Sequence, residues 1–177
     1  VGSAALAAFL LFGAYMDEVK NYMPSFQPVI NLNKPEVFVG AMLGSVLVYL
    51  FSSLAIKAVG KAAYAIINNV REQFKNNPGI MLGTSKPDYG SCVDIATKAA
   101  LQKMVLPGVL VVGMTVGVGV IFKWIYYAGG QLSTGASGAE VIGGYLMAGT
   151  ITGILMALFL NNGGGAWDNA KKYIETG

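Results

Sequence analysis

The sequence predicts an all-α protein, a polytopic bundle of transmembrane helices, and three observations support this fold class. Of the 177 residues, 54% are hydrophobic and 12% are charged, whereas an ordinary soluble domain has about 25% charged residues. The mean hydropathy is +0.56, and glycine, which is commoner in membrane helices than in soluble ones, occurs 24 times. Three long apolar runs approach the ~20 residues that a helix needs to cross a bilayer. About four membrane helices are expected, the first of them truncated.

The first predicted helix covers 1–16, and we interpret it as the second half of a membrane helix. It has no basic segment of the kind that begins a signal peptide, and it is shorter than the ~20 residues of a full span. Asp17 and the charged residues after it are expected to end the helix. Three prolines in the loop that follows cannot continue it. A chain that begins inside a helix is expected to be a section of a larger protein.

The second predicted helix covers 37–75 and contains the first full apolar run, Val37–Leu54. Gly40 and Gly44 are one turn apart on it and form a small-xxx-small pair, which lets another helix backbone approach closely. Beyond the apolar run the helical pattern continues through polar residues. The helix should therefore project out of the bilayer before Pro78 and Gly79 end it.

The third predicted helix covers 89–127, with a polar beginning and the second apolar run, Val105–Tyr127. Lys123, Trp124 and two tyrosines at its end are typical of a membrane–water interface. A glycine- and serine-rich loop is expected over Gly129–Glu140.

The fourth predicted helix covers 141–175 and begins with the third apolar run, Val141–Leu160. Small residues recur along this run at helical spacing, which indicates a helix that packs closely against neighbours rather than one that faces lipid.

The distribution of the 12 basic residues predicts the orientation in the membrane. Most of them lie in two regions, 57–103 and 161–177. The exceptions are Lys20, Lys34 and Lys123. The positive-inside rule therefore places those two regions, and with them the C-terminal stretch, in the cytoplasm. A chain this apolar is not expected to bind nucleic acid.

The densest cluster of chemically capable groups lies just after the last apolar run. Asp168, Lys171, Lys172 and Glu175 have helical spacing and can share a face. On spacing alone they could form weak surface ion pairs, worth a few tenths of a kcal/mol each. They could also form an anion and metal site, because lysines attract phosphate oxygens and a carboxylate suits Mg²⁺. Before them, Gly163–Gly165 would permit a backbone turn or a close approach by a ligand.

Several chemistries are excluded within this chain. It contains no histidine and a single cysteine, so it has neither histidine-based catalysis nor an internal disulfide. No Gly-Lys-Ser/Thr follows the glycine triplet, so the stretch is not a Walker A loop. The stretches Val37–Leu54, Val105–Phe122 and Val141–Leu160 contain no acidic or basic residue. An ion pathway normally needs such groups inside the membrane, so pathway residues are expected mainly outside this chain.

One stretch carries a resemblance to a known family. Gly164–Glu175, with the sequence Gly-Gly-Ala-Trp-Asp-Asn-Ala-Lys-Lys-Tyr-Ile-Glu, resembles a signature of the membrane-bound, ion-pumping inorganic pyrophosphatases. Supporting stretches occur in the order that the family has them. They are Gly2–Leu6 (Gly-Ser-Ala-Ala-Leu), Val70–Phe74 (Val-Arg-Glu-Gln-Phe) and Lys86–Tyr89 (Lys-Pro-Asp-Tyr), the last followed by Cys92.

The resemblance implies a fold and an activity. The family has about sixteen membrane helices in two concentric rings and works as a homodimer. It hydrolyses cytosolic Mg-pyrophosphate and moves H⁺, Na⁺ or both out of the cytosol. Residues 1–177 would be the C-terminal part of that single membrane-embedded domain, completed by the remaining helices of the same protein. The helices over 37–75 and 141–160 would help to form the dimer interface.

The resemblance also assigns roles to the C-terminal cluster. Asp168 would be a Mg²⁺ ligand, and Lys171 and Lys172 would contact or neutralise pyrophosphate. The carboxylates that position the attacking water would lie outside this chain, so the catalytic residues are unknown and this section alone would be inactive.

Other properties stay open. They are the pumped ion, the dependence on K⁺, and the choice between a prokaryotic plasma membrane and a vacuolar or acidocalcisome-type membrane. Two other functions are also considered. One is a section of a secondary transporter whose binding site is a glycine-broken helix, and the other is a structural membrane subunit.

Overall fold

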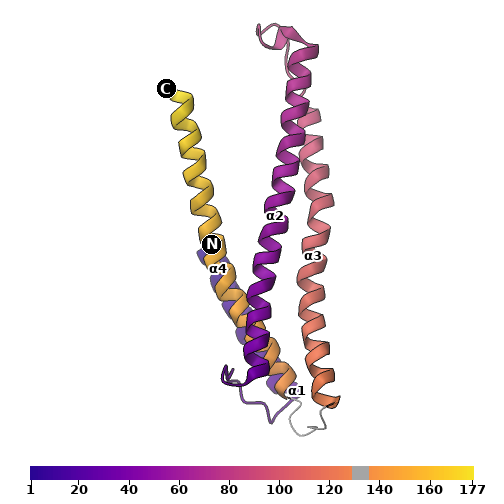
Figure 1. The fold of residues 1–177 in the computed structure, drawn as a ribbon, viewed down its shortest axis with the longest axis vertical. Coiled ribbons are helices and arrows are strands. Elements are labelled where there is room, and N and C mark those ends of the chain that lie inside the picture. Colours follow the sequence, from indigo (N-terminus) through magenta and orange to yellow (C-terminus); the bar gives the residue numbers. More distant parts are fainter. Residues whose placement is uncertain (129–135) are drawn as a thin grey trace. The chain divides into compact units, whose positions relative to one another are not determined.

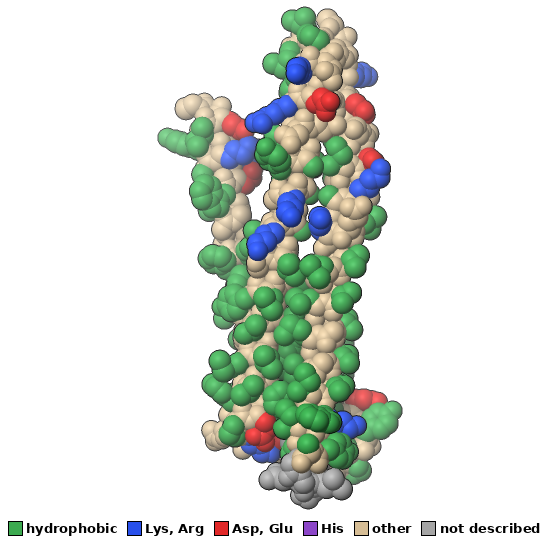
Figure 2. Space-filling view, turned by 45° about the vertical axis from the view of Figure 1, so that its right-hand side comes forward, with side chains coloured by type: hydrophobic (Ala, Val, Ile, Leu, Met, Phe, Trp, Pro, Cys, Tyr) green, Lys and Arg blue, Asp and Glu red, His purple; other side chains and the backbone are tan. Residues whose placement is uncertain are grey.

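The computed structural model describes residues 1–128 and 136–177, and it confirms the all-α prediction (Figure 1). Its helices are α1 (Gly2–Tyr22), α2 (Pro35–Asn76), the short 3₁₀ helix η1 (Pro78–Ile80), α3 (Tyr89–Ala128) and α4 (Ala136–Thr176). All four α-helices are long and apolar enough to cross a membrane. On the face shown in Figure 2, hydrophobic side chains cover long stretches of the helices, and Lys and Arg side chains lie partway along them as well as near their ends.

Helix α1 is longer than predicted. It continues through Asp17 and its charged neighbours to Tyr22, so the expected end at Met16 is wrong. Charge alone does not stop a helix, and Glu18 and Lys20 after Asp17 have good intrinsic helix propensities. The helix ends at Met23, whose backbone has φ −130° and ψ 84°. A residue that precedes a proline is sterically disfavoured in the helical region, and Pro24 follows.

Helix α4 begins before its predicted start. It is helical from Ala136, so the end of the loop predicted over Gly129–Glu140 is wrong, while residues 129–135 lie outside the described part. Alanine and glutamate are good helix formers, and both occur in this first stretch as Ala139 and Glu140. Helix α2 begins at Pro35, as expected of a residue whose missing N–H needs no partner in the first turn.

The chain divides into two compact units. The first unit comprises Val1–Tyr49 and Gly113–Gly177, and the second comprises Leu50–Val112. Among the described residues, the buried hydrophobic core belongs to the first unit. It consists of Met16, Phe26, Val37, Leu47, Val118, Val141 and Tyr145.

Within the first unit, α2 and α4 cross with almost no space between their backbones. A Cβ atom built on Gly44 would lie 2.1 Å from the carbonyl oxygen of Tyr145, and one built on Gly40 would lie 2.7 Å from that of Val141. Only glycine fits at these two positions. Both belong to the small-xxx-small pair of the sequence, which here forms a helix–helix contact. The hydroxyls of Ser45 and Thr152 are hydrogen-bonded across the same interface, at 2.9 Å.

Candidate functional site

The predicted site lies on the C-terminal turns of α4, and the structure pairs its charges along the helix. The Nζ atom of Lys172 is 2.7 Å from Oδ2 of Asp168, and the Nζ atom of Lys171 is 3.6 Å from Oε1 of Glu175. Each pair spans four positions, as helical geometry requires. The side chains are well exposed, at 54% for Asp168 and 64% for Lys172. The structure therefore brings together the residues that the sequence selected.

The glycine triplet before this cluster does not break the helix. Helix α4 is continuous from Ala136 to Thr176, so the turn that Gly163–Gly165 would have permitted is not formed. A Cβ atom built on any of the three glycines would meet nothing within 4 Å. The triplet thus leaves a bare stretch of helix surface, which a ligand or another helix backbone can approach closely.

The neighbouring aromatic side chains are exposed as well. Trp167 and Tyr173 are 80% and 79% exposed, and Ile174 is 79% exposed. Large apolar side chains that project from a helix in this way normally have a partner surface. In the described part of the chain, nothing covers this end of α4.

The ion pairs at the end of α4 can be replaced by contacts with a ligand at a small cost in free energy. Exposed ion pairs typically contribute about 0.2–1 kcal/mol, because water screens the charges and two long side chains must be held in place. Asp168 and Lys172 therefore form a weak ion pair that can break easily. An incoming phosphate or divalent cation can replace either partner at a cost below that of one strong hydrogen bond.

The donor set of this stretch fits Mg²⁺ in one particular mode. Mg²⁺ commonly takes one or two carboxylates together with substrate phosphates and water. Asp168 offers one accessible carboxylate, and within residues 1–128 and 136–177 no group of three or more acidic or cysteine side chains could enclose a metal. The fit is therefore to a metal shared with a bound anion and with groups beyond these residues.

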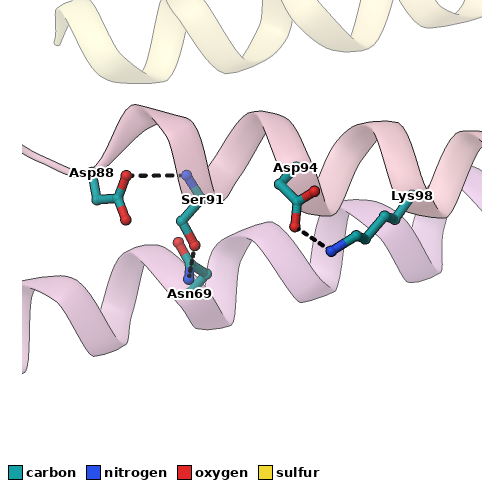
Figure 3. A network of polar contacts seen from close by, with 5 residues as sticks. All are labelled: Asn69, Asp88, Ser91, Asp94 and Lys98. Carbon is teal, nitrogen blue, oxygen red and sulfur yellow. Dashed lines mark hydrogen bonds and ion pairs between the residues drawn. The ribbon is translucent and has the colours of Figure 1, made fainter.

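A second polar constellation lies in the second unit, where the hairpin of α2 and α3 turns (Figure 3). The Nε2 amide of Gln73 donates to Oδ1 of Asn69 at 2.7 Å and to the Asp88 carbonyl at 3.1 Å. The backbone N–H of Asp88 donates in return to Oε1 of Gln73, at 2.8 Å. The thiol of Cys92 donates to Oδ1 of Asn69 at 3.4 Å, which gives this cysteine a structural role. The network fixes the loop against both helices.

The loop at this turn caps the N-terminus of α3 and borders a cavity. Asp88 accepts the backbone N–H of Ser91 at 3.1 Å, the geometry of a helix N-cap. A cavity of about 310 Å³ lies beside the network and is lined mainly by amide and charged side chains, among them Glu72 and Lys86. Six residues after the cap, Asp94 forms an ion pair of 2.7 Å with Lys98 (Figure 3). Sequence reasoning assigned none of these contacts. The bonds of Gln73 with Asp88 and of Cys92 with Asn69 form only when the hairpin closes, whereas the Asp94–Lys98 pair has the local four-residue spacing that could have signalled it.

A third polar contact lies in the first unit, near the start of α4. Lys34 is paired with Glu140, whose side chain is only 11% exposed. The hydroxyl of Tyr15 donates to the carbonyl of Ala139 at 2.9 Å. These contacts join α4 to the loop before α2 and to α1. They connect residues more than 100 positions apart in the sequence, and no local pattern signals them.

Comparison with known proteins extends over the whole chain. The sequence profile of a family described as "Inorganic H+ pyrophosphatase" matches residues 1–177. A protein of Moorella thermoacetica, named "K(+)-insensitive pyrophosphate-energized proton pump 2", is 56% identical over 180 residues. One of Caldanaerobacter subterraneus subsp. tengcongensis, named "K(+)-insensitive pyrophosphate-energized proton pump", is 55% identical over 181 residues. "Pyrophosphate-energized membrane proton pump 3" of Arabidopsis thaliana is 51% identical over 178 residues.

These alignments cover 100% of this chain but only 24%, 23% and 22% of the respective relatives. The chain therefore spans about a quarter of the length of the curated relatives that it matches. Together with the four helices that could cross a membrane, the matches identify an integral membrane protein.

Proposed function

Because this chain belongs to the inorganic H⁺ pyrophosphatase family, we propose that it forms part of a pump that couples hydrolysis of cytosolic Mg-pyrophosphate to proton translocation. The observation that carries this proposal is the family match over residues 1–177, which includes the Asp168–Lys172 cluster. Protons are favoured over Na⁺ because the three relatives are named as proton pumps. Independence from K⁺ is favoured because two of them are named K⁺-insensitive.

The end of α4 would supply part of the electrostatic stabilisation in this reaction. Asp168 would hold Mg²⁺, and Lys171 and Lys172 would contact the phosphate oxygens. When bound, Mg²⁺ offsets phosphate charge and polarises the phosphoryl oxygens. Fixed positive charge at the leaving phosphate lowers the energy of the transition state, because the site need not reorganise as charge develops. The carboxylates that position water would come from the rest of the protein.

The remaining surface of the chain would be covered by the same protein and by a second copy. Large apolar side chains are exposed along α2, α3 and α4, for example Phe38, Val112 and Leu155. In a complete pump these faces would contact lipid, the other helices or the partner of a homodimer, with α2 and α4 at the dimer interface. The excess of basic residues in 57–103 and 161–177 supports a cytoplasmic position for Asp168.

The test uses the full-length protein and a control pair that the chain itself provides. We expect Asp168→Asn and Lys171→Ala to reduce pyrophosphate hydrolysis in membranes at least a hundredfold, because each removes a charge that would contact Mg²⁺ or substrate. Asp94→Asn and Lys98→Ala are the controls. Asp94 is paired at 2.7 Å with a lysine four positions away, as Asp168 is, and the Lys98 side chain is 69% exposed against 66% for Lys171. These variants should keep near-normal rates.

Folding must be followed in parallel, by the amount of protein extracted and its elution as a single species in detergent. Near-normal hydrolysis by both Asp168→Asn and Lys171→Ala would refute the assigned roles. A loss of hydrolysis in the Asp94→Asn control as large as in Asp168→Asn would refute the claim that the α4 pair is special.

The alternative of a secondary transporter is less well supported. It required a helix broken at Gly163–Gly165, and α4 is continuous there. The same assay tests the alternative of a structural subunit without a site of its own. Under that alternative, Asp168→Asn should have no effect on hydrolysis.

A further inference from the structure

We propose that a cavity at the Lys123 end of the first unit binds the headgroup phosphate of a membrane phospholipid. The cavity has a volume of about 290 Å³, and its walls come from α1, α3 and α4. Tyr15, Lys123, Tyr126 and Tyr127 are the polar side chains that line it, and the other walls are mainly apolar. This volume lies just below the ~300–1,000 Å³ of ligand pockets, and it suits a headgroup better than a larger molecule.

The position of the cavity along the helices is that of lipid headgroups. It lies where α3 ends at Ala128 and where α4 begins at Ala136. Trp124, beside Lys123, is 70% exposed. Tryptophan, tyrosine and lysine together mark the membrane–water interface, because each has an apolar body and a polar tip. A ligand at this depth meets headgroups on one side and acyl chains on the other.

The charge of Lys123 is available for a ligand. It forms no ion pair with any residue of 1–128 or 136–177. Its described contact is with the ring of Tyr127, whose centroid lies 5.9 Å from Nζ. An ammonium group has three N–H donors. A ring face is a weaker hydrogen-bond acceptor for them than a phosphate oxygen. An anionic oxygen is therefore the ligand that this cation lacks.

Two features favour a lipid phosphate over a soluble one. The mainly apolar walls would contact the glycerol and upper acyl carbons of a lipid, and a free phosphate ion would gain nothing from them. The cavity is also remote from the proposed pyrophosphate site. Ala139 at the cavity and Asp168 lie near opposite ends of the continuous helix α4, about 44 Å apart along its axis at 1.5 Å per residue. The lipid site is thus separate from the proposed substrate site.

Native mass spectrometry of the full-length protein, titrated with phosphatidylglycerol in detergent, tests the proposal. We expect Lys123→Gln to weaken retention of the lipid about tenfold, the loss of one charged hydrogen bond, and Lys123→Arg to preserve it. Lys20→Gln is the matched control, because Lys20 also lies near the end of its helix but does not line the cavity. Titration with inorganic phosphate in place of lipid should give no adduct that depends on Lys123.

Pyrophosphate hydrolysis by Lys123→Gln should stay normal in the same detergent, which separates this proposal from the assignment of Asp168. Equal lipid retention by the wild type and Lys123→Gln would overturn the proposal, since it would mean that another helix fills the cavity or that lipid binds elsewhere. A phosphate adduct that Lys123→Gln abolishes would overturn the choice of a lipid and indicate a soluble anion.

Discussion

Asp168 and Lys172 show how much, and how little, the geometry of a residue pair says about its role. Their Nζ to Oδ2 distance is 2.7 Å, the same as between Lys98 and Asp94, and both pairs are more than half exposed. Helical spacing predicted the α4 pair from the sequence, because positions four apart lie on one face. Spacing alone is compatible both with an ordinary surface pair, which it favours slightly, and with a substrate site. The motif around Asp168 separates them, since only that pair lies in a stretch that resembles a family signature.

The pair of Lys34 and Glu140 is the opposite case, because no sequence pattern predicts it. The two residues are 106 positions apart, and they meet only when α4 docks against the loop before α2. Glu140 is nearly buried, so its negative charge depends on Lys34 for compensation.

For this pair we expect Lys34→Ala to lower the melting temperature of the purified full-length protein, with a loss of about 1.5–3 kcal/mol. Removing Glu140 as well should restore part of that loss, because the double variant leaves no unpaired buried charge. The measurement is a double-mutant cycle on thermal unfolding. Strictly additive effects of Lys34→Ala and Glu140→Ala would contradict the pairing.

At the scale of elements, hydropathy predicted the long helices, and prolines mark helix ends. The apolar runs predicted the membrane class and each long helix, because a bilayer requires every backbone polar group to be paired within the helix. The two misplaced boundaries have different causes. Helix α1 passes through the charged Asp17 and ends before Pro24, and helix α4 begins early because its first stretch contains good helix formers. At Gly163–Gly165 the helix continues, although glycine in a helix costs roughly 0.5–1 kcal/mol per residue.

The crossing of α2 and α4 allows a prediction with an internal control. A methyl group at Gly44 would overlap the Tyr145 carbonyl, at 2.1 Å, and backbone atoms cannot move aside without separating the helices. We expect Gly44→Ala to lower the melting temperature markedly. Gly60→Ala, on the same helix, would meet nothing within 4 Å and should be neutral or stabilising by up to about 1 kcal/mol.

The comparison is read from thermal unfolding of the two variants in one detergent. Equal melting temperatures for Gly44→Ala and Gly60→Ala would mean that the close crossing of α2 and α4 does not exist in the full-length protein.

At the scale of the whole molecule, the chain is about a quarter of the length of its relatives. Its exposed apolar faces and the uncovered end of α4 are what such a section of a helix bundle should show. The fold class and the C-terminal cluster could be predicted because apolar runs, helical spacing and a short motif are local features. The bonds between Gln73 and Asp88 could not, since the turn between two helices brings these residues together.

The most direct test of the central claim is binding without turnover. In the full-length protein, a non-hydrolysable pyrophosphate analogue with Mg²⁺ should raise the melting temperature, since a ligand at a hundred times its Kd stabilises by about 2.7 kcal/mol. We expect this shift to need Mg²⁺, to persist in Asp94→Asn and to be lost in Asp168→Asn. A full Mg²⁺-dependent shift in Asp168→Asn would contradict the proposal that the end of α4 holds Mg-pyrophosphate.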